Sequence, residues 1–221
     1  MHGGLTIEES TSDLFGFWRA GHVGSFAPSL AGGLRDGLGG WTAAEIVEYL
    51  KTGSNDKSSA AGAMAEVVTN STQYLTDADL ADIAVYLKDM PDPKSEAASG
   101  NIDKDTTSLG AQVYTDDCTG CHMDGGEGLA HVFPPLKGSS AVQAANPDTM
   151  VQAVLGGAGI PATKDKPTGL KMPAFNEKLD DAQIAAVVSY IRNAWGNHAS
   201  TVSTSAVAKM RAAMKQKGAG G

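Results

Sequence analysis

The sequence predicts an all-α protein built from a repeated helical unit. Residues 77–88 and 181–192 both place apolar side chains at positions i, i+3, i+4 and i+7, which is the period of an amphipathic helix. The two segments agree in kind or identity at most positions, at an offset of 104 residues. Because a recurring segment marks a recurring structural unit, we expect two related helical parts.

The first part contains two predicted helices, over residues 46–53 and 77–88. Gly53 ends the first of them, because glycine readily adopts the left-handed conformation found at helix C-termini. Asp77 lies in the first turn of the second, where the helix dipole stabilises a carboxylate. Residues 12–22 carry no cysteine. The first part therefore resembles the back half of a unit that has lost its front.

The second part contains three predicted helices. Leu109 and Val113 lie on one face of a helix that extends to Asp117. A short helix over residues 150–157 ends at a glycine, and a terminal helix covers residues 180–195. The second part therefore contains every helix expected of the complete unit.

These elements divide the chain into four segments. Residues 1–92 form a partial unit, residues 93–100 a polar, proline-marked linker, and residues 101–200 the complete unit. Residues 201–221 form a basic tail helix. Its apolar side chains are those of Val207, Met210 and Met214. Such a helix can lie on an anionic membrane surface; the alternative is a solvated helix or one that docks on a partner.

The composition is that of a globular protein without a nucleic-acid partner. Of the 221 residues, 42% are hydrophobic and 19% charged, and the formal net charge is −8, whereas nucleic-acid binding requires a basic surface. No apolar run approaches the ~20 residues that span a bilayer. Residues 1–4 lack both the basic and the apolar region of a signal peptide. We expect that a leader has been removed or, preferably, that the chain is an internal piece of a longer one.

The strongest motif is Cys118-Thr119-Gly120-Cys121-His122, which has the C-x-x-C-H pattern of c-type haem attachment and uses the only two cysteines of the chain. Each thiol adds across one haem vinyl group, and the histidine binds the iron. The motif predicts one covalent haem c held by Cys118 and Cys121, with His122 as an iron ligand.

Two other readings of this motif compete with haem attachment. A thioredoxin-like pair would follow a strand in a β-α-β pattern, and no such pattern is visible. A zinc site would need four protein ligands, for example the two cysteines with His122 and His131. Adjacent Cys121 and His122 are poorly placed for a tetrahedral zinc site.

The residues around the motif resemble the class I cytochrome c family. A helix leads into C-x-x-C-H, then Gly125-Gly126-Glu127-Gly128 and Val132-Phe133-Pro134-Pro135-Leu136 follow. The resemblance implies that a proline carbonyl accepts a hydrogen bond from Nδ1 of His122 and so fixes its tautomer. Pro134 and Pro135 are the candidates, and we place Pro135 among the haem-binding residues.

The resemblance also implies a methionine as the second axial ligand. Met172 is followed by proline in the loop before the last helix, where the family places this ligand. Met123 is too close to His122 to reach the other haem face, and Met150 lies on an apolar helix face. Met64 holds the parallel place in the first part, as a vestigial or second-haem ligand or as a packing residue.

Several segments resemble a narrower group, the multihaem cytochrome c subunits of membrane-bound bacterial dehydrogenases for alcohols, gluconate or sorbitol. The segments that carry this resemblance are residues 39–53, 64–77, 132–136, 172–175 and 192–196. Family members carry three C-x-x-C-H motifs, and this chain has one. The chain therefore resembles the carboxy-terminal half of such a subunit.

The resemblance implies an electron-transfer subunit rather than an enzyme by itself. Electrons would pass from a dehydrogenase catalytic subunit through the haem to ubiquinone or another electron-transfer protein, in the periplasm and in peripheral contact with the membrane. With His122 and Met172 filling both axial positions, the iron has little room for a substrate. The alternative is a haem enzyme or ligand-binding sensor in which the sixth ligand is displaced.

Overall fold

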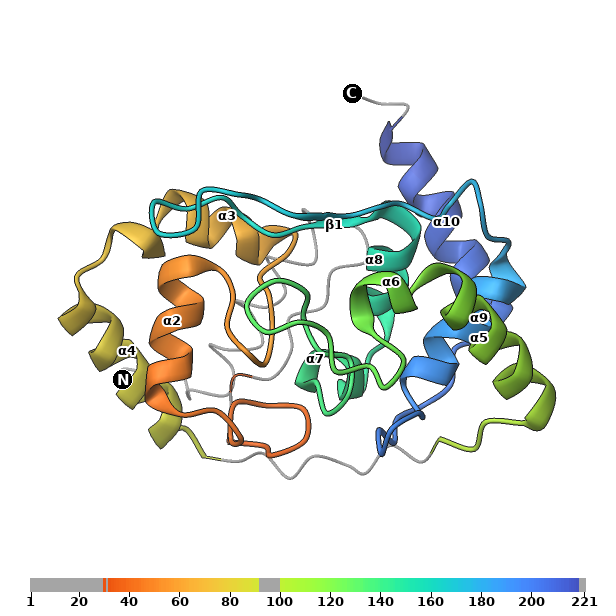
Figure 1. The fold of residues 1–221 in the computed structure, drawn as a ribbon, viewed down its shortest axis with the longest axis horizontal. Helices are drawn as coiled ribbons and strands as arrows, with labels where there is room; N and C mark the ends of the chain where they lie inside the picture. The colour runs from red at the N-terminus through yellow and green to blue at the C-terminus, as the bar shows by residue number, and fades with distance from the viewer. Residues whose placement is uncertain (1–29, 31, 92–99, 219–221) are drawn as a thin grey trace, which may run out of the picture.

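A computed structural model describes residues 30, 32–91 and 100–218, with side chains up to residue 216. It confirms the all-α prediction: the described residues form helices and one two-stranded ribbon. In Figure 1 helices α2 to α4 lie in one lobe and helices α5 to α10 in another. The predictions for residues 12–22 and for most of the linker at 93–100 lie outside the described residues. The proposed domain boundaries at residues 92 and 100 remain predictions.

The first lobe consists of α2 (Ala43–Thr52), α3 (Ala63–Asn70), the short 3₁₀ helix η1 (Thr72–Tyr74) and α4 (Asp77–Asp89). Reciprocal capping boxes begin α2 at Thr42 and α4 at Thr76, so their first backbone N–H groups are satisfied. Gly53 ends α2 as predicted, at φ 80°. The core of this lobe consists of Trp41, Ile46, Leu50, Leu80 and Ala84.

The second lobe is built on the crossing of two helices. They are α5 (Lys104–Asp117) and α9 (Asp181–Ile191), joined by α6 (Thr119–His122), α7 (Ser140–Gln143) and α8 (Asp148–Gly156). At the crossing, a Cβ on Gly110 would lie 2.4 Å from the carbonyl oxygen of Ala186, so only glycine allows this approach. The buried core of this lobe is separate from that of the first lobe.

The repeated helices α4 and α9 have different surroundings. Ser189 of α9 is fully buried, whereas Val85, its counterpart in α4, is 64% exposed. Tyr190 packs against Tyr114 of α5, whereas its counterpart Tyr86 is 67% exposed. Among the described residues, no helix covers α4 as α5 covers α9.

An extended ribbon crosses from the second lobe to the first (Figure 1). Strands β1 (Ala158–Gly159) and β2 (Lys171–Met172) pair antiparallel, with Ala158 opposite Met172. The loop between them reaches the first lobe, where the backbone N–H of Lys164 donates to Gln73 Oε1 at 3.1 Å. The ribbon therefore ties the two lobes together.

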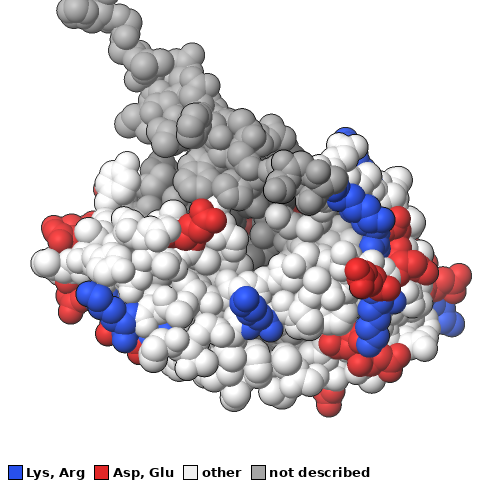
Figure 2. Space-filling model, turned by 90° about the horizontal axis from the view of Figure 1, so that it is seen from above, with Lys and Arg blue, Asp and Glu red and all other residues white. Residues whose placement is uncertain are grey.

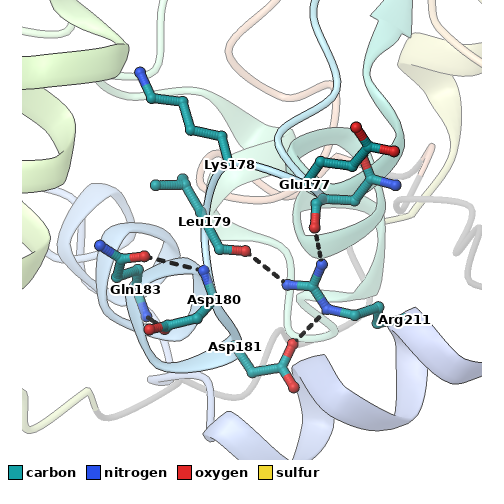
Figure 3. Close-up of a pocket in the computed structure, with 8 residues that line it drawn as sticks. Glu177, Lys178, Leu179, Asp180, Asp181, Gln183 and Arg211 are labelled. Carbon is teal, nitrogen blue, oxygen red and sulfur yellow. Dashed lines mark hydrogen bonds and ion pairs between the residues drawn. The ribbon is translucent and has the colours of Figure 1, made fainter.

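The tail forms α10 (Thr204–Gly218), which packs on the second lobe. Val207 is fully buried and Met210 nearly so, and both belong to the core that contains α8 and α9 residues. Figure 3 shows Arg211 reaching from α10 to the turn before α9, where its Nε lies 2.6 Å from Asp181 Oδ1. The guanidinium also donates to the carbonyls of Asn176 and Leu179. The apolar residues expected to face a membrane or a partner are therefore occupied within this chain.

The described surface agrees with the composition. On the face seen in Figure 2, acidic and basic side chains mix toward the ends of the molecule, and the surface between them is largely neutral. This face carries no continuous basic patch among the described residues. Within the described residues, no helix is both long enough and apolar enough to span a bilayer.

Candidate functional site

The haem-attachment motif lies where α5 ends and the single-turn helix α6 begins. Cys118 is the C-cap of α5, and its N–H donates to Tyr114 O at 2.9 Å. Its carbonyl then accepts from the N–H of His122 at 2.9 Å, so the motif is folded as one helical turn. Cys121 is exposed, and burial raises the pKa of the Cys118 thiol to about 12.

The imidazole of His122 is oriented by a backbone carbonyl. Its Nδ1 lies 3.0 Å from the carbonyl oxygen of Pro134, which fixes the tautomer with the proton on Nδ1. Burial lowers the pKa of His122, partly offset by this hydrogen bond, so the neutral ring is favoured. Among the described residues none hydrogen-bonds to Nε2. The free lone pair therefore lies on Nε2, as an iron ligand requires.

The hydrogen bond of His122 selects between the two prolines that the sequence left open. The carbonyl beside Nδ1 belongs to Pro134, and a role of Pro135 in binding haem stays a prediction. The reason is the path of the loop: Leu136 N and Lys137 N both donate to Gly126 O, at 2.8 and 2.9 Å. These bonds fix the end of the loop so that the Pro134 carbonyl is the one beside the imidazole.

Aromatic side chains pack against the loop that follows His122. A Cβ on Gly126, whose φ is 68°, would lie 2.5 Å from the ring of Trp195. Tyr114 packs on Trp195 with ring centroids 4.9 Å apart, and its hydroxyl donates to Met123 O at 2.7 Å. The residue after His122 is thus bound to the helix that leads into the motif.

Met172, Met150 and Met64 lie in different environments. Met172 is in β2, partly buried against the core that Cys118 and Leu136 also contact. Met150 packs against the same core from α8, as expected for a packing residue. Met64 lies on α3 and packs against the core of the first lobe, in a helix rather than in a ribbon. The structure therefore gives Met64 a packing environment, and its role as a haem ligand stays a prediction.

The zinc reading does not fit this geometry. His131, its proposed fourth ligand, has Nδ1 3.0 Å from Glu48 Oε1 and Nε2 3.0 Å from Asp56 Oδ1. Both ring nitrogens are therefore engaged by the first lobe. Within the described residues no three His, Cys, Asp or Glu side chains converge on a metal position.

Arg192 has a structural role that its sequence context did not predict, although it lies in a segment that carries the family resemblance. Its side chain is fully buried, and it donates to the carbonyls of Val142, Ala144 and Ser200 at 2.7, 3.0 and 2.8 Å. Burial, with a contribution from Arg35, lowers the pKa of Arg192 to about 10. In the sequence, the only indication of a role for Arg192 was its alignment with another basic residue, Lys88, in the repeat.

The donor set fits a covalent haem c. The motif provides two free thiols and an imidazole with an available Nε2, and β2 provides the partly buried thioether of Met172. This combination matches thioether attachment with histidine and methionine as axial ligands.

Comparison with known proteins gives the same result. The cytochrome c family matches residues 107–195. The cytochrome c subunit of alcohol dehydrogenase (quinone) from Gluconobacter oxydans (strain 621H) is 40% identical over 195 residues, 84% of this chain and 41% of the relative. The gluconate 2-dehydrogenase cytochrome c subunit of Pantoea cypripedii is 35% identical over 196 residues, 84% of this chain and 44% of the relative.

A smaller relative is covered more fully. Cytochrome c-552 of Thermus thermophilus is 34% identical over 92 residues, which are 40% of this chain and 69% of that protein. By contrast, the chain spans less than half the length of the two dehydrogenase subunits. The predicted resemblance is confirmed: the chain belongs to the cytochrome c family and is related to the cytochrome c subunits of bacterial dehydrogenases.

Proposed function

We propose that this protein transfers single electrons through one haem c, attached at Cys118 and Cys121, with His122 and Met172 as axial ligands. The observation that carries the proposal is the 3.0 Å contact between His122 Nδ1 and Pro134 O, which leaves Nε2 available directly after the two thiols. When bound, haem c supplies a reversible one-electron couple. The residues of the chain hold, orient and shield it.

Each of these residues has a distinct task. The two cysteines fix the porphyrin edge, so the haem cannot dissociate during turnover. The Pro134 carbonyl polarises the Nδ1–H bond and makes Nε2 more basic, which stabilises Fe(III). The soft thioether of Met172 favours Fe(II) and raises the reduction potential. With the iron held by both His122 and Met172, these residues would leave no open position for a substrate.

We further propose a dehydrogenase catalytic subunit as the electron donor and ubiquinone or another electron-transfer protein as the acceptor. The support is the similarity to cytochrome c subunits of alcohol, gluconate and fructose dehydrogenases. A periplasmic location follows from the place where c-type haem is attached. We do not assign peripheral membrane contact to α10, because Val207 and Met210 are buried in the second lobe.

The number of haems is tested by intact mass under denaturing conditions, together with the pyridine haemochrome spectrum. The proposal expects the mass of one haem added to the chain and a haemochrome typical of two thioether links. Cys118→Ser should reduce attachment to a single thioether. A second haem that is released on denaturation would contradict the haemless assignment of the first lobe and renew the case for Met64.

The axial ligands are tested with Met172→Ala and the matched control Met150→Ala, a partly buried methionine of the same core. Met172→Ala should give a high-spin haem that binds CO readily and has a lower potential. Met150→Ala should keep the low-spin spectrum. If Met172→Ala also kept it, the sixth ligand would be another residue. A wild-type protein that is high-spin and binds CO would favour the sensor or enzyme alternative.

A further inference from the structure

The first lobe contacts two segments that position the proposed axial ligands. One is the proximal loop, residues 123–137, in which Pro134 orients His122. The other is the ribbon, which comprises β1, β2 and the loop between them and includes Met172. Glu48 of α2 touches both: its Oε1 lies 3.0 Å from Nδ1 of His131 in the loop and 3.6 Å from Nζ of Lys166 in the ribbon.

The proximal loop forms a hairpin that places His131 near its tip. Leu129 and Phe133 exchange backbone hydrogen bonds of 2.9 and 2.8 Å, which form a tight hairpin with His131 near its tip. His131 has a φ of 58°, a left-handed conformation that non-glycine residues adopt only when their surroundings hold it. The hairpin leads directly into Pro134. A displacement of His131 is therefore transmitted to the carbonyl that orients His122.

Two carboxylates of the first lobe contact the His131 ring from opposite sides. Asp56, in the loop after α2, lies 3.0 Å from Nε2, opposite the contact that Glu48 makes with Nδ1. An imidazole donates from both nitrogens only when it is protonated, so the imidazolium is the form that satisfies both carboxylates. The two carboxylates therefore hold the ring from opposite sides and fix the tip of the loop.

The ribbon is held by separate contacts. Besides Glu48, the Lys166 ammonium donates to the carbonyl and hydroxyl oxygens of Ser54, at 3.2 and 2.9 Å. A Cβ on Gly53 would lie 2.4 Å from Pro161, so the ribbon and the end of α2 are in close contact. The other charged groups at this edge, Lys57 and Glu45, pair with each other at 3.6 Å.

We propose that the first lobe is a clamp for the haem site, with Glu48, Asp56, His131 and Lys166 as positioning residues for the two axial ligands. This inference rests on the proposed His122 and Met172 ligation. It gives a role to a lobe that has no attachment motif among its described residues. Glu48 links the proximal loop to the ribbon, because its carboxylate contacts both His131 and Lys166.

The experiment uses the haem-loaded full chain and four variants: His131→Gln, Asp56→Asn, Lys166→Met and Glu48→Gln. Two quantities are measured at neutral pH: the midpoint potential, and the affinity of the ferric haem for added imidazole, which competes with Met172. His198→Gln is the control, because His198 is also exposed and takes no part in the clamp. Thermal unfolding confirms that each variant is folded.

Each variant should show its own pattern. Lys166→Met loosens the ribbon and should raise imidazole affinity about two- to fivefold, the range expected for loss of a partly exposed ion pair. His131→Gln should shift the midpoint potential, because the loop that carries Pro134 loses both carboxylate contacts. Asp56→Asn should shift the potential in the same direction by less, because the contact with Glu48 remains. Glu48→Gln should change both quantities.

Two different failures can be told apart. If the wild type shows a low-spin histidine–methionine spectrum and all four variants match it in potential and imidazole affinity, the clamp is wrong and the proposed function stands. If the wild-type spectrum lacks methionine ligation, the proposed ligand set fails first. A shift of the potential in His198→Gln equal to that in His131→Gln would also overturn the assignment to His131.

Discussion

The contact between Gly126 and Trp195 allows a quantitative test of how the haem loop is held. Replacing Gly126 with alanine places a Cβ 2.5 Å from Cε3 of Trp195, closer than side-chain carbons approach one another. The indole cannot easily move away, because Tyr114 and Tyr190 pack on it at centroid distances of 4.9 and 5.6 Å. The loop must therefore shift instead.

The expected loss in the free energy of unfolding of Gly126→Ala combines two effects. The left-handed backbone at Gly126 costs alanine ~1–2 kcal/mol, partly offset by ~0.4–1 kcal/mol from the lower entropy of the unfolded chain. Overpacking against Trp195 adds ~1–3 kcal/mol. Gly138 separates these effects, because its φ is 69° and a Cβ there would meet nothing within 4 Å. The difference between the two variants isolates the clash.

The assay is urea unfolding of the haem-loaded Gly126→Ala and Gly138→Ala variants, with the potential of each. Gly126→Ala should be less stable than Gly138→Ala by ~1–3 kcal/mol. Its potential should also change, because the displaced loop carries Pro134, whereas Gly138→Ala should keep the wild-type value. Equal stability of the two variants would refute the reasoning that Trp195 holds the loop.

Three further predictions concern stability. Arg192→Ala leaves two buried carbonyls and the partly buried carbonyl of Ser200 without their donor and should cost ~3–5 kcal/mol in urea unfolding; a loss below ~1 kcal/mol would show that water replaces the guanidinium. Val207→Asp should detach α10 and expose it to proteolysis, whereas Ala206→Asp, on the exposed side, should not; equal cleavage would contradict the docking of α10. Thr76→Ala removes the N-cap of α4 and should cost ~1 kcal/mol at neutral pH. The hydrogen bond from the Thr76 hydroxyl lowers the pKa of Asp79. The stability that this hydrogen bond contributes is therefore present above the ordinary pKa of 3.8 and is lost as the pH falls through the folded-state pKa. The stability gap between Thr76→Ala and wild type should therefore narrow in acid, and a constant gap would assign the effect to the helix alone.

Local signals predicted the helices well. The apolar period of residues 77–88 and 181–192 corresponds to α4 and α9, because side chains three and four positions apart share one face of a helix. Gly53 was correctly placed at the end of α2. The ribbon was not predicted, because two residues per strand leave no alternation to detect.

The site was predictable only where its chemistry is local. Cys118, Cys121 and His122 lie within one turn, so their spacing alone identifies haem attachment. The choice between Pro134 and Pro135 was not local: adjacent carbonyls differ only in direction, and hydrogen bonds to Gly126 from the far end of the loop set that direction. His131 gave no signal as a link to Glu48, which lies 83 positions earlier in the chain.

The sequence by itself determined the helical class, the repeat and the covalent haem motif, because each depends on side chains a few positions apart. Tertiary structure decided that the first lobe contacts both the loop that contains Pro134 and the ribbon that contains Met172, that Arg192 is buried and that the apolar side of α10 is already covered. These facts arise from contacts between residues tens of positions apart, whose free energies depend on three-dimensional packing rather than on spacing. The single C-x-x-C-H motif thus identifies the cofactor, and the fold around it determines how firmly its ligands are held.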